Sequence, residues 1–236
     1  SEIQRITPED PDVRSVICLD GKAIALPISA DYDAFVRAPT GVIEARFGQS
    51  VFRLDVSQDV TDGLSWQLAV YAAHALQAAG KFAMREQAAH RAIWLTGEVD
   101  CALNIRPVDH VARKLRQSGR LITDLAMAGT PLTIYVPRQN FAELDDETLR
   151  AAGINDLTCR LVPVDEIADV LADLRLPVRS RSTPFRHSPK TLRWSRWITA
   201  PLAICAGLSV MAVGANLSTS VKDVAVVSPP KPLLQQ

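Results

Sequence analysis

Three short segments carry the residue types in this chain that are best suited to chemistry. Residues 61–65 supply a serine, 95–98 a threonine and a glutamate, and 106–115 a lysine with acidic and basic neighbours. A serine hydroxyl is a weak nucleophile until a nearby base removes its proton. A lysine can be that base when burial away from water disfavours its charged form. The three segments therefore hold the groups needed to attack a carbonyl carbon.

These segments resemble motifs of the proteolytic domain of the Lon protease family. That family has a serine in a D-G-P-S-A-G turn at a helix start, then a strand ending in T-G-E, then a V-x-P-[IV]-G-G-L-x-x-K-L segment. The matching residues are Asp62, Gly63, Ser65, Thr96, Gly97, Glu98, Pro107, Val108 and Lys114. Downstream, 133–140 is similar to the family's strand ending in I-P-x-x-N, and 160–174 is similar to its closing strand and helix.

The resemblance implies a serine endopeptidase with a Ser-Lys dyad. Ser65 would attack the scissile carbonyl, Lys114 would accept and return the proton, and Thr96 would hold the lysine amine by a hydrogen bond. Backbone N–H groups at the helix start could receive the oxyanion, which contributes about 3 kcal/mol per donor. The supporting residues in this scheme are Thr96, Asp62, Gly63 and Glu98.

The sequence departs from the family pattern next to both members of the dyad. Leu64 stands where the family has proline before the serine, and Trp66 and Gln67 stand where it has Ala-Gly after it. Asp109 and His110 replace the Gly-Gly ahead of the lysine. A tryptophan beside the nucleophile could narrow the substrate cleft, and Asp109 and His110 bring a charge and an imidazole near the dyad.

Two functions remain open at this point. In the first, the protein cuts flexible or unfolded segments of a protein or peptide substrate. By itself it acts without ATP, and a partner ATPase could supply unfolded substrates. In the second, Ser65 only caps a helix and Lys114 is a surface lysine. The protein is then an inactive relative that serves as an interaction or assembly module of a bacterial membrane complex. Lon-type domains form hexameric rings, so the resemblance also implies a homo-oligomer.

The composition excludes several classes of protein. Of the 236 residues, 47% are hydrophobic and 22% are charged, so the chain is not disordered as a whole. Its 26 basic and 26 acidic residues balance, whereas a nucleic-acid-binding protein usually has a basic excess. Dinucleotide and P-loop fingerprints are absent, so no ATPase domain is expected. No cofactor or metal is expected either, because the histidines and the widely spaced cysteines share no metal-ligand spacing.

The periodicity of apolar residues predicts an α/β (α+β) fold, which the resemblance makes a Lon-type proteolytic domain with a β-rich N-terminal half. Val- and Ile-rich runs predict strands at 13–19, 22–28, 41–47 and 51–56. An Ala- and Leu-rich helix follows at 65–81. Further strands are expected at 92–97, 131–137 and 158–164, and further helices at 108–118, 121–128, 144–153 and 165–174.

The last quarter of the chain predicts a membrane anchor. From Trp197 to Leu217 there is no charged residue, and at about 1.5 Å per residue this helix would cross a bilayer core of about 30 Å. Basic residues without acidic ones precede it, which places the N-terminal side in the cytoplasm. The expected location is the bacterial inner membrane, with a single span through the lipid bilayer. The expected divisions are an arm (1–12), the Lon-protease-like domain (13–176), a basic linker (177–196), the transmembrane helix (197–217) and a short tail (218–236).

Overall fold

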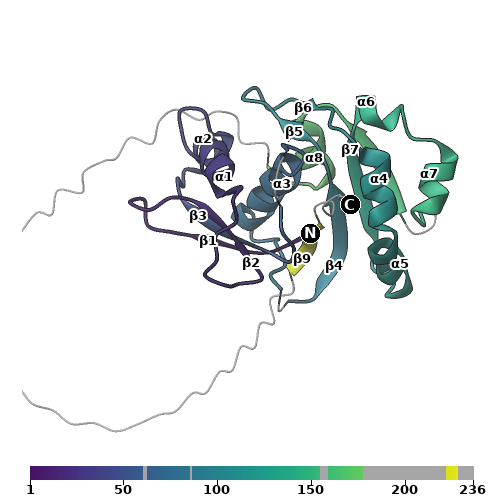
Figure 1. Ribbon diagram of the computed structural model, residues 1–236, viewed down its shortest axis with the longest axis horizontal. Coiled ribbons are helices and arrows are strands. Elements are labelled where there is room, and N and C mark those ends of the chain that lie inside the picture. The colour runs from purple at the N-terminus through teal and green to yellow at the C-terminus, as the bar shows by residue number, and fades with distance from the viewer. Residues whose placement is uncertain (61–62, 86, 155–158, 178–221, 228–236) are drawn as a thin grey trace, which may run out of the picture. The chain divides into compact units, whose positions relative to one another are not determined.

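A seven-stranded mixed sheet organises the fold (Figure 1). The computed structural model describes residues 1–60, 63–85, 87–154, 159–177 and 222–227. The strand order is β2-β3-β1-β9-β4-β7-β8. The strands are Glu2–Pro8 (β1), Val16–Leu19 (β2), Phe52–Val56 (β3), Ala89–Leu95 (β4), Leu132–Pro137 (β7), Cys159–Val164 (β8) and Lys222–Val227 (β9).

The half of the sheet that follows α3 is parallel, with β4 pairing β7 and β7 pairing β8. Helices connect these strands, as parallel pairing requires. A two-stranded hairpin, Glu98–Val99 (β5) and Ile105–Arg106 (β6), follows the end of β4. The helices are Ser29–Val36 (α1), Val42–Phe47 (α2), Gln67–Ala78 (α3), Val111–Gln117 (α4), Gly119–Met127 (α5), Arg138–Phe141 (α6), Asp146–Ala151 (α7) and Ile167–Asp173 (α8).

Helices cover both faces of β4, so its side chains alternate between two hydrophobic cores. Ile93 and Leu95 belong to the larger core, which also takes in buried residues of α1, α2, α3 and α8. Ala92 and Trp94 belong to the smaller core, with α4 and α5. Because alternate residues of a strand point to opposite faces, α3 and α4 lie on opposite sides of β4.

Three predictions for the N-terminal half are wrong. The expected arm at 1–12 contains β1, which lies inside the sheet and buries Ile3 and Ile6. The expected strand at 22–28 is reduced to an isolated bridge at Ala25. The expected strand at 41–47 is α2, in which the adjacent residues Val42 and Ile43 are both buried, a helical burial pattern and not the alternation of a half-buried strand. The N-terminal half is therefore mixed, and α1 was not predicted.

The predicted C-terminal tail contains an interior strand. Residues Lys222–Val227 form β9, which pairs parallel to β4 and antiparallel to β1. Val226 is fully buried and belongs to the larger core. The sequence analysis did not predict this strand. A six-residue segment between an apolar run and a Pro-rich end is too short to show a clear strand pattern. The prediction that 218–236 is a tail without a fold of its own is wrong for these residues.

The predicted fold class is also wrong in its last element. In the part of the chain that the structure describes, no helix combines the length and the apolar character needed to cross a bilayer. The transmembrane helix expected at 197–217 is therefore not supported. Residues 197–217 lie outside the described residues, as does the basic linker expected at 177–196 except for its first residue.

His74 gives the larger core a dependence on pH. It is 2% exposed, its Nε2 lies 3.0 Å from the Tyr32 hydroxyl, and burial lowers its pKa from 6.5 to about 3. The folded chain keeps this imidazole neutral while the unfolded chain protonates it below pH 6.5, so stability falls as the pH drops through this window. Between pH 7 and 5, we expect the wild type to lose about 2 kcal/mol more of its free energy of unfolding than His74→Gln loses. Urea unfolding of both proteins at the two pH values measures this difference, and equal losses would contradict it.

Candidate active site

Ser65 lies in the turn that leads into α3. Two residues earlier, Gly63 has φ of 74°, in the left-handed region that glycine adopts at little cost. Among the described residues, neither the Ser65 hydroxyl nor the backbone N–H groups of Ser65 and Trp66 have a hydrogen-bond partner. A hydroxyl and two N–H donors are thus available side by side at the start of a helix, where the first N–H groups have no acceptor within the helix.

Two backbone hydrogen bonds fasten this turn to the end of β4. The N–H of Gly97 donates to the carbonyl oxygen of Ser65 at 3.0 Å, and the N–H of Leu68 donates to the carbonyl oxygen of Gly97 at 3.1 Å. A Cβ at position 97 would lie 2.9 Å from the Ile105 side chain and 3.2 Å from that of Leu68. Only glycine allows the first turn of α3 to approach the strand end this closely, so Gly97 positions Ser65.

Thr96, which directly precedes Gly97, holds a buried hydroxyl. It is fully buried, and its N–H donates to the carbonyl oxygen of Tyr135 at 3.3 Å, which continues the pairing of β4 with β7. In the described part of the chain, Thr96 Oγ1 has no hydrogen-bond partner. A buried hydroxyl without a hydrogen-bond partner lowers the free energy of unfolding by about 1–3 kcal/mol. A polar group that forms a hydrogen bond with Thr96 Oγ1 would therefore stabilise the protein.

Lys114 lies on the face of β4 toward which Thr96 points. Trp94 Nε1 donates to Ser118 Oγ at 3.0 Å, and Ser118 Oγ donates to the carbonyl oxygen of Lys114 at 2.9 Å. Thr96 is two residues beyond Trp94 on the same face, roughly 6.6 Å along the strand. Lys114 is one helical turn before Ser118, roughly 5.4 Å along α4, which runs opposite to β4. The two residues therefore lie at the same level between helix and strand.

The Lys114 side chain is mostly buried, and its amine forms no direct ion pair with a described residue. Lys114 is 9% exposed, and no hydrogen bond or ion pair within the described residues involves its Nζ. Burial lowers the pKa of Lys114, while the nearby carboxylate of Asp109 opposes this shift. Burial is the larger effect, so this amine loses its proton more readily than a solvated lysine does.

Trp66 does not narrow the approach to Ser65, contrary to the expectation from its position. It is 4% exposed and packs edge-on against Tyr32 and Phe35 in the larger core, and its indole N–H donates to the carbonyl oxygen of Gly63 at 2.7 Å. The exposed neighbour of Ser65 is Leu64.

His110 occupies a backbone position suited to glycine. It has φ of 62°, in the left-handed region, and immediately precedes α4. A non-glycine residue costs about 1–2 kcal/mol in this conformation. The turn into α4 therefore has a backbone conformation typical of glycine at position 110, although this chain has Asp109 and His110 where the motif has two glycines.

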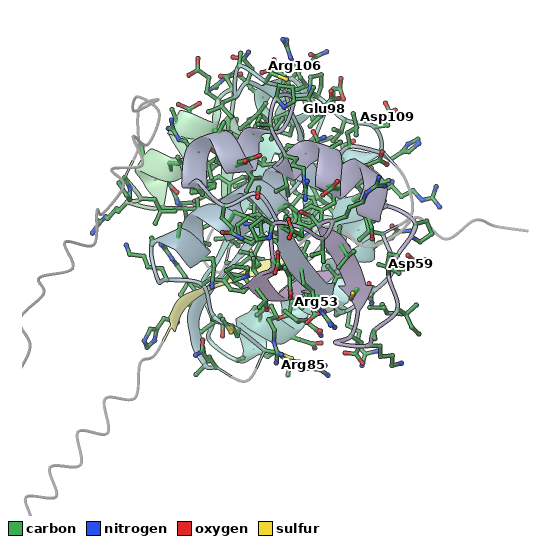
Figure 2. All side chains as sticks on the ribbon, turned by 90° about the vertical axis from the view of Figure 1, so that its left-hand side faces the viewer. Arg53, Asp59, Arg85, Glu98, Arg106 and Asp109 are labelled. Carbon is green, nitrogen blue, oxygen red and sulfur yellow. The ribbon has the colours of Figure 1, made fainter. Side chains whose placement is uncertain are left out.

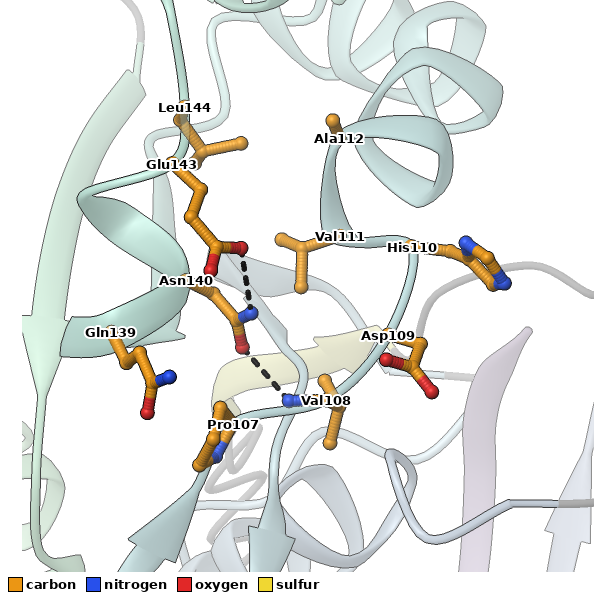
Figure 3. Close-up of a pocket in the computed structure, with 10 residues that line it drawn as sticks. All are labelled: Pro107, Val108, Asp109, His110, Val111, Ala112, Gln139, Asn140, Glu143 and Leu144. Atoms are coloured by element: carbon orange, nitrogen blue, oxygen red, sulfur yellow. Dashed lines mark hydrogen bonds between the residues drawn. The ribbon is translucent and has the colours of Figure 1, made fainter.

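A pocket of about 370 Å³ opens between the segment 107–112, which leads into α4, and residues of 139–144, which follow β7 (Figure 3). Asn140 joins the two segments, because its Oδ1 accepts a hydrogen bond of 2.9 Å from the N–H of Val108. Its Nδ2 lies 3.4 Å from Glu143 Oε2. The pocket therefore lies at the carboxyl ends of β4 and β7, the usual place for ligand sites in parallel sheets.

The structure brings some of the predicted site residues together and leaves others apart. Ser65, Thr96 and Gly97 meet at the end of β4, and Lys114 lies at the level of Thr96. In the described residues, no hydrogen bond or ion pair joins Ser65 to Lys114, and the expected hydrogen bond between Thr96 and the Lys114 amine is not formed. Glu98 begins β5, opposite Arg106 in register, and lies at the same end of the molecule as Asp109 (Figure 2).

Asp62 lies outside the described residues. Within those residues no group of three His, Cys, Asp or Glu side chains could hold a metal ion.

Sequence reasoning placed Asp109 and His110 near the dyad, but it did not predict that they line a pocket together with Gln139, Asn140 and Glu143. A signal was present for one of them. Asn140 comes three residues after the end of a predicted strand, where polar residues of neighbouring parallel strands meet at one edge. Glu143 carried no such signal, because its place depends on how α6 turns back over the end of β7.

Comparison of the chain with protein-family models, with curated proteins and with solved structures finds no match. The likeness to the Lon family therefore rests on the short motifs alone.

Proposed function

We propose that this protein is a hydrolase that cleaves peptide bonds with Ser65 as the nucleophile and Lys114 as the general base. The observation that carries the proposal is the mostly buried side chain of Lys114, whose pKa is lowered by burial and whose amine makes no hydrogen bond or direct ion pair among the described residues. Buried lysines with lowered pKa are used as catalytic bases, whereas a surface lysine stays charged at pH 7. The buried Thr96 hydroxyl, which has no hydrogen-bond partner among the described residues, would orient this amine if the two groups came into contact when substrate binds.

The reaction follows from these groups. Lys114 Nζ takes the proton of Ser65 as its Oγ bonds to the scissile carbonyl carbon, and the N–H groups of Ser65 and Trp66 receive the oxyanion. The carbon–nitrogen bond then breaks, and the leaving amine takes the proton from Lys114. A water molecule next gives a proton to Lys114 and attacks the acyl-serine ester. The acid is released as the proton returns to Ser65.

A cleavage assay tests this function. The full chain is incubated with unfolded casein, and new peptides are counted by mass spectrometry for the wild type, Lys114→Met and Lys22→Met. Lys22 is an exposed lysine, and Lys22→Met makes the same chemical change far from the proposed base. We expect cleavage by the wild type and by Lys22→Met, and none above background by Lys114→Met. A folded wild type that releases no peptides would overturn the proposal.

The same variant carries a prediction for stability. Burial of most of the lysine side chain deprives its amine of part of its hydration, which costs free energy, and Met fills a similar volume without that cost. We expect Lys114→Met to have a free energy of unfolding roughly 1 kcal/mol higher than that of the wild type, and therefore a higher unfolding temperature. An inactive but stabilised variant fits a residue kept for chemistry. A variant destabilised by several kcal/mol would instead make Lys114 structural.

A further inference from the structure

Two exposed carboxylates line the pocket beside the proposed base and form no direct ion pair with a described residue. Asp109 comes from the segment that leads into α4, and Glu143 from the segment after β7 (Figure 3). Neither takes part in an ion pair within the described residues. No lysine or arginine lines the pocket. A cavity with two negative charges and no positive one favours a positively charged ligand.

A buried amide organises the floor of this pocket. Asn140 is 6% exposed, and its Oδ1 is engaged by the N–H of Val108. Its Nδ2 reaches Glu143 Oε2 at 3.4 Å, which uses one N–H of the amide and orients the carboxylate. The second N–H has no partner in the described part of the chain, nor does the other oxygen of Glu143. A donor and several acceptors thus remain for a ligand, together with the apolar side chains of Val111 and Leu144.

We propose that this pocket binds a lysine or arginine side chain of the peptide substrate, with Glu143 and Asp109 receiving its cationic end. The inference rests on the proposed function, because it makes the pocket a specificity subsite for the same reaction. Apolar walls suit the methylene stem of a long basic side chain, and carboxylates suit its charged end. A pocket of about 370 Å³ lies within the range of typical ligand sites, about 300–1,000 Å³.

Occupation of the pocket would also act on the base. Asp109 favours the charged form of Lys114, which opposes its use as a base. A cationic side chain bound by Asp109 offsets that carboxylate and leaves the amine of Lys114 easier to deprotonate. The correct substrate thus helps to activate the residue that cleaves it, and neutral substrates lack this help.

A binding experiment isolates the pocket from the chemistry. The full-length Ser65→Ala chain is titrated with a short peptide containing one arginine and with the same peptide containing citrulline, which keeps the shape and loses the charge. We expect the arginine peptide to bind at least about tenfold more tightly than the citrulline peptide. This ratio of dissociation constants corresponds to one charge-assisted hydrogen bond. Glu143→Gln should remove most of this ratio and Asp109→Asn part of it. Glu147→Gln, an exposed glutamate outside the pocket, should keep it.

A cleavage experiment then tests the role in specificity. Peptides released from casein by the wild type are expected to have lysine or arginine at a constant position relative to the cut. Glu143→Gln should lower cleavage at these positions relative to other sites, whereas Glu147→Gln should keep the wild-type preference. Equal binding of the arginine and citrulline peptides would overturn the inference. Binding that prefers arginine, together with cleavage that ignores basic residues, would also overturn it. Arginine-selective binding in a chain that cleaves nothing would instead overturn the proposed function and leave cation binding by the pocket standing.

Discussion

Replacement of Ser65 by Ala is expected to abolish peptide cleavage, with a loss of at least about a thousandfold, while the chain stays folded. Loss of a nucleophile removes the covalent route, and losses of this size or larger follow such changes in serine hydrolases. The fold should tolerate the change, because the Ser65 hydroxyl makes no hydrogen bond among the described residues. The thermal unfolding midpoint should therefore stay within about 1 °C of the wild-type value. Peptide release from casein and thermal unfolding of the same samples measure both effects.

A covalent probe separates nucleophilic attack from other roles of Ser65. A serine-directed phosphonate should add its mass to one residue of the wild type, at Ser65, and should leave Ser65→Ala unmodified. Ser50→Ala is the matched control, because Ser50 is also partly exposed and lies before β3, outside the proposed site. It should label and cleave as the wild type does. Cleavage that persists in Ser65→Ala would rule Ser65 out as the nucleophile.

Substitution of Val226 by Asp is expected to produce the largest loss of stability. Val226 is fully buried in β9, where it lies in register with Ile3 of β1 and with Ile93 of β4. A carboxylate there would be buried without a partner, which costs roughly 4 kcal/mol or more. For a chain of this size each kcal/mol lowers the unfolding midpoint by about 2–4 °C, so we expect a drop of at least about 8 °C.

A smaller substitution provides the control for this effect. Val226→Ala removes two methyl groups without adding charge, and it should lower the free energy of unfolding by only about 1–2 kcal/mol. Thermal or urea unfolding of the full chain compares the three proteins. If Val226→Asp unfolds like the wild type, residues 222–227 are not an interior strand of the sheet in solution.

The position of β9 also connects the end of the chain to the proposed site. It pairs with β1 on one side and with β4 on the other, and β4 ends at Thr96 and Gly97, which hold the Ser65 turn. Loss of β9 would leave the backbone groups of Ala89–Trp94 without partners along one edge. We therefore expect Val226→Asp to lower peptide cleavage together with stability.

Local patterns in the sequence predicted most of the longer elements between Gly63 and Asp173, but not the β5–β6 hairpin or α6. The Ala- and Leu-rich run expected at 65–81 contains α3, and the strands expected at 92–97 and 131–137 correspond to β4 and β7. These segments are long enough for their apolar period to be read, and glycine or proline marks their ends. The same patterns misassigned 41–47, because valine and isoleucine favour strands while the tertiary contacts of α2 favour a helix there.

The serine, the threonine and the lysine were visible in the sequence as residue types, but their relation in space was not. The burial that lowers the pKa of Lys114 depends on how α4 packs in the tertiary structure, and the level shared by Thr96 and Lys114 follows from the antiparallel run of helix and strand. Both depend on contacts between segments far apart in the chain, which a local pattern does not encode. The same holds for β9, whose place between β1 and β4 is determined by backbone groups that only the assembled sheet leaves open.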